Sequence, residues 1–207
     1  MKNELRNILS GKNKVRFGTI IQAISGYLRE SAKTGTETKN SKFFKKQETA
    51  QLEHYISQNN LWINNINFTQ YVSEGAEQRV FLKNTKSVLK LNDSIYYVSW
   101  EDYLHNLLLH NYFFSDTAYE LLGFTKDNNI LYAVVQQNFV EADSATDLQT
   151  VKLFLEQNGF LNSRNNDYYN ADLGIILEDL HDENVLTQNN ILYFIDTVFY
   201  LTDEFWK

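Results

Sequence analysis

Three polar residues near the carboxyl end of the chain have types and a spacing that suit phosphoryl transfer. Asp179 precedes Asn184 by five residues, and Asp196 follows Asn184 by twelve residues, at the end of an apolar run. In enzymes of this chemistry one aspartate takes the proton of the acceptor hydroxyl, while an asparagine and a later aspartate hold magnesium ions. The spacing therefore predicts Asp179 as the catalytic base, and Asn184 and Asp196 as Mg²⁺ ligands beside bound ATP.

Residues upstream of this segment fit the binding of a nucleotide. Lys90 alternates with apolar neighbours in a β-prone run, so we expect it to project from one face of a strand and bind phosphates. Gly75 stands in the preceding turn, where a phosphate-binding loop would lie, although such loops carry several glycines. Glu101 shares a helix face with leucines and is expected to form an ion pair with Lys90. The predicted cofactor-binding residues are Gly75, Lys90, Glu101, Gln136, Gln137 and Asn138, the last three as a hinge whose backbone binds adenine.

Each of these residues also has a plain structural interpretation. A lysine on a strand can extend out of the sheet to water, and a glycine can serve an ordinary hairpin turn. Glu101, or its neighbour Asp102, can stabilise a helix N-terminus. The acidic segment 178–183 can form a metal-dependent hydrolase site or a solvated loop. The histidines at 54, 105 and 110 are expected to be core or surface imidazoles.

Periodicity along the chain predicts the elements that position these residues. Apolar residues at helical spacing predict helices over 17–30 and 43–58, joined by a polar linker over 31–41. From residue 68, β-prone runs separated by turn residues predict an antiparallel meander up to residue 91. The elements predicted after it are a helix over 100–114, a hairpin over 117–140, a helix over 146–158 capped by Gly159, and short strands at 174–177, 185–186 and 191–195.

Composition limits the classes of function. The 207 residues include no cysteine, which excludes disulfides and thiolate chemistry. A net charge of −7 argues against a general nucleic-acid binder, and the lysines of 39–46 are interpreted as a solvated helix start. The apolar runs are shorter than the roughly 18 residues of a membrane span, and the first residues lack the apolar core of a signal peptide. We therefore expect a cytoplasmic protein without a membrane partner.

Several short motifs allow a comparison with known families. The segment Asp179-Leu180-His181-Asp182-Glu183-Asn184 is similar to the Asp-x-His-x-x-Asn loop of aminoglycoside phosphotransferases and kinase-like proteins. The chain over roughly 60–201 resembles the polyvalent-protein kinase family, whose members occur on bacterial mobile elements and phage. The further motifs that carry the resemblance are Glu74-Gly75-Ala76-Glu77, Leu89-Lys90-Leu91, His110-Asn111, Gly123-Phe124 and Gln136-Gln137.

The resemblance implies an α+β, protein-kinase-like fold of two lobes. Residues 1–60 would be a helical extension and 61–207 a minimal kinase-like domain. Within that domain an antiparallel N-lobe sheet would span about 61–137 and a reduced C-lobe about 138–207. Its implied activity is ATP- and Mg²⁺-dependent transfer of the γ-phosphate to a protein or small-molecule hydroxyl.

Two departures from the family pattern favour an alternative function. Thr197-Val198 follow Asp196 where protein kinases have Phe-Gly, and the chain ends at Lys207, so we expect a truncated C-lobe. A pseudokinase-type module that binds a nucleotide or a partner without efficient transfer is the alternative. Tyr168, Tyr169 and a loop over 162–166 are predicted to line the mouth of a substrate site.

Overall fold

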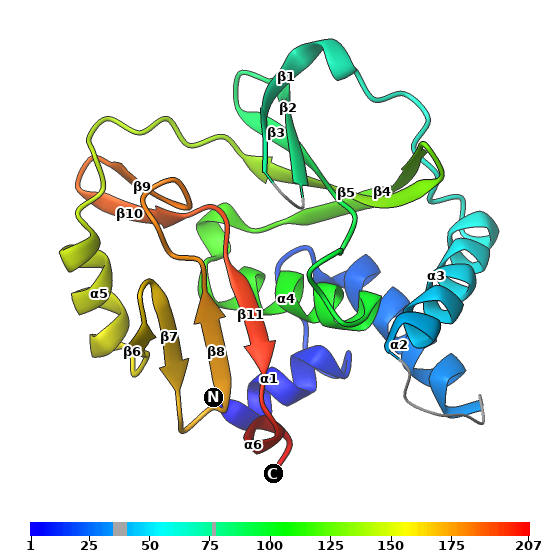
Figure 1. The fold of residues 1–207 in the computed structure, drawn as a ribbon, viewed down its shortest axis with the longest axis horizontal. Coiled ribbons are helices and arrows are strands. Elements are labelled where there is room, and N and C mark those ends of the chain that lie inside the picture. The colour runs from blue at the N-terminus through cyan, green and yellow to red at the C-terminus, as the bar shows by residue number, and fades with distance from the viewer. Residues whose placement is uncertain (35–40, 76–77) are drawn as a thin grey trace.

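The computed structural model describes residues 1–34, 41–75 and 78–207, and shows an α+β fold with antiparallel sheets (Figure 1). Its α-helices are α1 Lys2–Leu9, α2 Gly18–Thr34, α3 Ser41–Gln58, α4 Trp100–Phe113, α5 Leu148–Gln157 and α6 Asp203–Trp206. Its strands are β1 Tyr71–Glu74, β2 Gln78–Asn84, β3 Ser87–Asn92, β4 Glu120–Asp127, β5 Ile130–Asn138, β6 Leu161–Arg164, β7 Asp167–Asn170, β8 Ile175–Glu178, β9 Val185–Gln188, β10 Ile191–Phe194 and β11 Val198–Leu201. Short 3-10 turns, η1 Phe68–Gln70 and η2 Ser115–Thr117, complete the set.

The first sheet places Lys90 at its centre. Its strand order is β1-β2-β3-β5-β4, with antiparallel pairing throughout. Lys90 lies opposite Val80 of β2 and Val135 of β5. Because side chains alternate across a strand, Val88 and Lys90 face the same side of the sheet.

The second group of strands brings the acidic segment next to Asp196. One sheet has the order β11-β8-β7-β6, and β9 pairs with β10 in a separate hairpin. Strand β8 ends at Glu178, which lies opposite Val198 at the start of β11. The residues that follow β8 and those that precede β11 must therefore lie side by side.

Helix α4 lies between the first sheet and these strands, and the N-terminal helices pack on it (Figure 1). It is buried over most of its length, from Trp100 to Asn111. Leu5 of α1, Ile24 of α2 and Ile56 of α3 belong to the same buried hydrophobic cluster as the leucines of α4. The first three helices thus share one core with the rest of the chain.

Most predicted elements are confirmed, with boundaries that differ by a few residues. The predicted turn between β4 and β5 is confirmed, with Asn128 and Asn129 at φ of 48° and 64°, a conformation that asparagine tolerates. Gly159 follows α5 with φ of +81°, as expected of a helix C-cap. Helix α2 continues through Thr34 and α3 begins at Ser41, so residues 31–34 and 41 of the expected linker are helical, while residues 35–40 lie outside the described part of the chain.

Other elements escape the prediction or correct it. Helix α1 was not expected, because its sequence is largely polar, yet Leu5, Ile8 and Leu9 bury one face. The loop expected over 162–166 is the β6–β7 hairpin with Asn165 in its turn. Strand β11 and helix α6 were also not predicted. No helix in the described ranges is long and apolar enough to span a membrane.

Candidate active site

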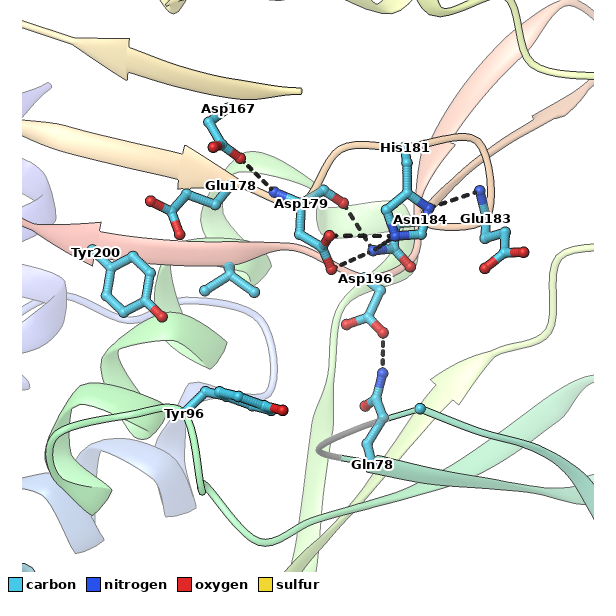
Figure 2. Close-up of a pocket in the computed structure, with 12 residues that line it drawn as sticks. Gln78, Tyr96, Asp167, Glu178, Asp179, His181, Glu183, Asn184, Asp196 and Tyr200 are labelled. Carbon is cyan, nitrogen blue, oxygen red and sulfur yellow. Dashed lines mark hydrogen bonds and ion pairs between the residues drawn. The ribbon is translucent and has the colours of Figure 1, made fainter. Parts of the chain in front are cut away.

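Two cavities meet between the first sheet and the segment around Asp196. The sheet cavity, of about 290 Å³, lies against β1, β2, β3, the end of β5 and the β9–β10 hairpin. The acidic cavity, of about 500 Å³, lies over the ends of β8 and β11 (Figure 2). Both cavities are lined by Gly75, Gln78, Glu183, Asn184 and Asp196.

Lys90 is a buried cation in the wall of the sheet cavity. Its side chain is only 4% exposed, and its Nζ donates a hydrogen bond of 2.7 Å to the Ile195 carbonyl oxygen. The same nitrogen lies 3.7 Å from Oδ2 of Asp196 and 5.4 Å from the centre of the Tyr119 ring. Since a buried charge is costly without a partner, the Asp196 carboxylate stabilises Lys90 in this position.

Asp196 is held by residues from distant parts of the chain. Gln78 of β2 donates its amide to Oδ2, and the Tyr119 hydroxyl lies 3.4 Å from Oδ1. Burial, followed by the charge of Asp196, raises the pKa of Tyr119 well above its ordinary value, so this phenol stays protonated and donates. Neither Gln78 nor Tyr119 was predicted as a site residue.

Asp179 occupies a tight turn at the end of β8. Its φ is 67°, and its backbone N–H donates to Asp167 at 3.2 Å. The amide nitrogen of Asn184 donates to the Asp179 carbonyl oxygen at 2.8 Å and to its carboxylate at 2.9 Å, and His181 lies 3.3 Å from the carboxylate (Figure 2). Burial raises the pKa of Asp179, opposed by His181, and Asp196 raises it further.

The backbone of the β9–β10 hairpin connects Asn184 to Asp196. The N–H groups of Ile195 and Asp196 lie 2.9 Å and 3.3 Å from the Asn184 carbonyl oxygen. Hairpin pairing of β9 with β10 brings the two ends of the segment together, although twelve residues separate them. The structure thus gathers Asp179, Asn184, Asp196 and Lys90 at one place.

Glu101 does not lie where the sequence analysis expected it. Its carboxylate accepts a hydrogen bond of 2.9 Å from Arg29 of α2 and lies 3.5 Å from His105. It lines neither cavity, whereas Asp196 lies 3.7 Å from the Lys90 Nζ. The expected Lys90–Glu101 pair is therefore wrong for this structure, because an arginine from the N-terminal helices binds the glutamate.

The three predicted hinge residues are placed differently from one another. The side chain of Gln136 lines neither cavity and accepts a hydrogen bond from Lys83, whereas its predicted role uses the backbone and stays a prediction. Gln137 and Asn138 line the sheet cavity, but their amides bind the carbonyl oxygens of Thr117 and Asp116 at 2.7 Å and 3.1 Å. Their side chains hold η2 in place.

Gly75 and the expected substrate mouth complete the predicted set. Gly75 lines both cavities and its N–H donates to the Gln78 carbonyl oxygen at 2.9 Å, while Ala76 and Glu77 of the same turn lie outside the described residues. Tyr168 is buried, and neither Tyr168, Tyr169 nor residues 162–166 line the sheet cavity or the acidic cavity. From this part of the chain, Asp167 at the start of β7 lines the acidic cavity instead.

A buried histidine supports the segment after Asp196. His110 of α4 lies 2.7 Å from the Thr197 hydroxyl through Nδ1 and 3.0 Å from the Thr117 carbonyl oxygen through Nε2. Burial, together with the nearby Lys90 charge, lowers its pKa to about 3 despite the hydrogen bond to Thr117, so the ring is neutral. Since a carbonyl only accepts, Nε2 carries the proton and Nδ1 accepts from Thr197. This confirms the expected core imidazole.

Two side chains at the shared wall, Asn184 and Asp196, could hold a metal ion. Asn184 uses its amide nitrogen on Asp179, and among the described residues no hydrogen bond engages its Oδ1. Asp196 adds a carboxylate that faces both cavities, and one carboxylate with an amide oxygen and waters suits Mg²⁺. Within the described ranges no three His, Cys, Asp or Glu side chains gather as a metal group.

Comparison with known families settles which family this arrangement represents. The model of a family described as serine/threonine/tyrosine kinases found in polyvalent proteins matches residues 45–203. The match covers more than half of the chain and includes all four of the gathered residues. The chain belongs to this kinase family. No curated protein and no solved structure matches the chain.

Membership of the polyvalent-protein kinase family confirms the resemblance seen in the sequence. The match begins within α3 and ends at the start of α6, so it includes every strand of the described structure. Helices α1 and α2 precede the matched region, although they share its core. Kinases of known mechanism use ATP as phosphoryl donor, which directs attention to the sheet cavity.

Proposed function

We propose that the chain is an ATP- and Mg²⁺-dependent kinase that transfers the γ-phosphate to a hydroxyl group. The observation that supports this most is the convergence of Lys90, Asp179, Asn184 and Asp196 where the two cavities meet. A nucleotide in one cavity and an acceptor in the other would meet at this point. The family description names serine, threonine and tyrosine, which favours a protein acceptor over a small molecule.

The sheet cavity has the composition of a nucleotide site. Its walls include the apolar side chains of Val80, Val88 and Leu186, which suit an adenine ring, and Lys90, which suits phosphates. The backbone at the end of β5 offers N–H and C=O groups at the edge of the ring. In this proposal the first sheet is the N-lobe, the strands after α5 form a reduced C-lobe, and residues 1–60 form a helical extension.

The acceptor side of the reaction belongs to Asp179. Asn184 fixes its backbone and its carboxylate, which points into the acidic cavity. The carboxylate orients the acceptor hydroxyl and takes its proton while the bond from the γ-phosphorus to ADP breaks and a bond to the acceptor oxygen forms. A magnesium ion bound by Asn184 and Asp196 would neutralise charge on the phosphates.

A nucleotide-binding module without efficient transfer is the second candidate. Gln78 occupies one oxygen of Asp196. This contact favours a state in which Asp196 is only partly available to a metal ion.

Transfer of labelled γ-phosphate decides between the two candidates. We expect the wild-type chain with Mg²⁺ and ATP to label peptides containing serine, threonine or tyrosine, or the chain itself. Asp179→Ala should reduce transfer by about 10²- to 10⁴-fold while nucleotide binding is kept. Binding without transfer in the wild type supports the second candidate, and equal transfer by Asp179→Ala excludes Asp179 as the base.

A further inference from the structure

The acidic cavity carries more negative charge than the proposed transfer uses. Asp179 and Asp196 have roles in that chemistry, whereas Asp167, Glu178 and Glu183 line the cavity without one. No lysine or arginine of the described chain lines it, and His181 is the one lining side chain there that can become positive. The cavity is therefore suited to a ligand with positive charge.

The unused carboxylates next to Asp179 share the acidic cavity with two aromatic rings. Asp167 and Glu178 share the cavity with Tyr96, from the loop after β3, and with Tyr200 of β11. In Figure 2 Asp167, Glu178 and Tyr200 lie on one side of Asp179, opposite Asn184 and Glu183. We call this end of the cavity, formed by Asp167, Glu178, Tyr96 and Tyr200, the cation pocket. Carboxylates combined with aromatic faces bind ammonium and guanidinium groups.

The charges in the cation pocket are incompletely balanced. Burial raises the pKa of Glu178, and the neighbouring carboxylates of Asp167 and Asp179 raise it further. No ion pair in the described residues involves Glu178, and one oxygen of Asp167 accepts the Asp179 N–H. A bound cation would relieve this repulsion between like charges.

We propose that the cation pocket binds a lysine or arginine side chain of a peptide acceptor, adjacent to the residue whose hydroxyl meets Asp179. The hydroxyl position rests on the proposed kinase function, but the binding of the basic side chain does not require transfer. A peptide is favoured over a small amine because Val198 and Tyr200 add an apolar and aromatic wall along β11 beyond the two carboxylates. The substrate class is therefore a basic peptide containing a hydroxyl residue.

Peptide binding tests this assignment without nucleotide. Fluorescence anisotropy would compare a labelled serine peptide flanked by arginines with the same peptide carrying glutamines. We expect the wild type to bind the arginine peptide at least about tenfold more tightly, a preference that declines with added salt. Glu178→Gln and Asp167→Asn should each remove most of that preference. Asp182→Asn is the matched control, since it removes the same charge from an exposed loop position outside both cavities.

Three results would overturn the proposal. The first is equal binding of the two peptides by the wild type. The second is an equal change in the preference for the arginine peptide in Glu178→Gln and Asp182→Asn, both folded. A small amine-bearing alcohol that binds through Glu178 while no peptide binds would show a different substrate class. If Glu178→Gln does not fold, Asp167→Asn and the salt dependence still decide. Failure of the kinase proposal appears separately, as an absence of nucleotide binding with the peptide preference intact.

Discussion

Lys90 and Asp196 form the central charged pair of the site. The two come from distant parts of the chain: Lys90 also binds the carbonyl oxygen of Ile195, the residue before Asp196, which is 105 residues away in the sequence. Short motifs around Lys90, Asp179 and Asn184 carried enough local pattern to be predicted. Glu101 was assigned the wrong partner, because Arg29, which binds it, comes from another element. Gln78 had no local signal at all, since its partner Asp196 lies 118 residues away.

Replacing Lys90 tests its role at the residue scale. Lys90→Met keeps a long apolar side chain but removes the charge, so we expect nucleotide affinity to fall by about tenfold or more, as lost charge-assisted contacts would cause. Titration calorimetry with ATP and Mg²⁺ would measure the change. Lys83→Met on the neighbouring strand is the control, because Lys83 lines neither cavity. Equal affinities of the two variants would contradict a phosphate-binding Lys90.

At the element scale, α4 positions the site through buried polar contacts, and α3 in turn binds the start of α4. Periodicity predicted both helices well, because amphipathic spacing is a local property. It could not predict which polar side chains of α4 reach the β10–β11 connection. His110 and Asn106 do so, through Thr197 and the N–H of Phe199.

Removing the hydroxyl of Thr197 tests this connection. In Thr197→Val, Nδ1 of His110 loses its donor in a buried site, so the free energy of unfolding should fall by about 1–3 kcal/mol in urea denaturation. Thr125→Val changes another buried threonine, in strand β4, whose side chain shows no hydrogen bond among the described residues, and should have a smaller effect. A larger loss for Thr125→Val than for Thr197→Val would refute the assigned role of His110.

Glu48 of α3 makes stability depend on pH. Its carboxylate accepts the N–H groups of Trp100 and Glu101 at 2.6 Å and 3.0 Å, and burial raises its pKa from 4.5 to about 7 despite these bonds. The folded chain thus retains a proton that the unfolded chain loses. Stability should therefore fall as pH rises from about 4.5 to about 7, by about 3 kcal/mol from this group.

Urea denaturation at pH 5 and pH 8 would measure this effect. The loss of stability between the two pH values should be smaller in Glu48→Gln than in the wild type, because the variant cannot ionise. Glu30→Gln, at an exposed position of α2, should retain the wild-type difference. An equal loss of stability between pH 5 and pH 8 in the wild type and in Glu48→Gln would contradict a raised pKa of Glu48.

At the scale of the whole molecule, helices α1 and α6 from opposite ends of the described chain lie against each other (Figure 1). The Arg6 guanidinium donates two hydrogen bonds to the Phe205 carbonyl oxygen, at 2.8 Å and 2.5 Å. The sequence could predict the order of the elements but not this contact, which depends on packing between residues far apart. The α+β class and the family followed from local patterns, whereas the seating of α1 and α2 on α4 did not.

Removing the Arg6 side chain tests how strongly its hydrogen bonds to the Phe205 carbonyl oxygen hold α6 in place. Arg6→Ala leaves a helix-terminal carbonyl without its charged donor, so we expect a loss of about 1–2 kcal/mol and faster hydrogen exchange at 203–206. Arg164→Ala, at an exposed position of β6, should change neither quantity. Unaltered exchange in Arg6→Ala would show that α6 is held by other contacts.

Thermal stability with ATP, with and without Mg²⁺, tests the central claim most directly. Nucleotide at 100 times its dissociation constant should stabilise the wild type by about 2.7 kcal/mol, which corresponds to roughly 5–10 °C for a chain of this length. We expect that this rise requires Mg²⁺, is lost in Asp196→Asn, and is kept in Asp172→Asn, an exposed control. No rise at ATP concentrations of millimolar order, or an equal rise in Asp196→Asn, would contradict it.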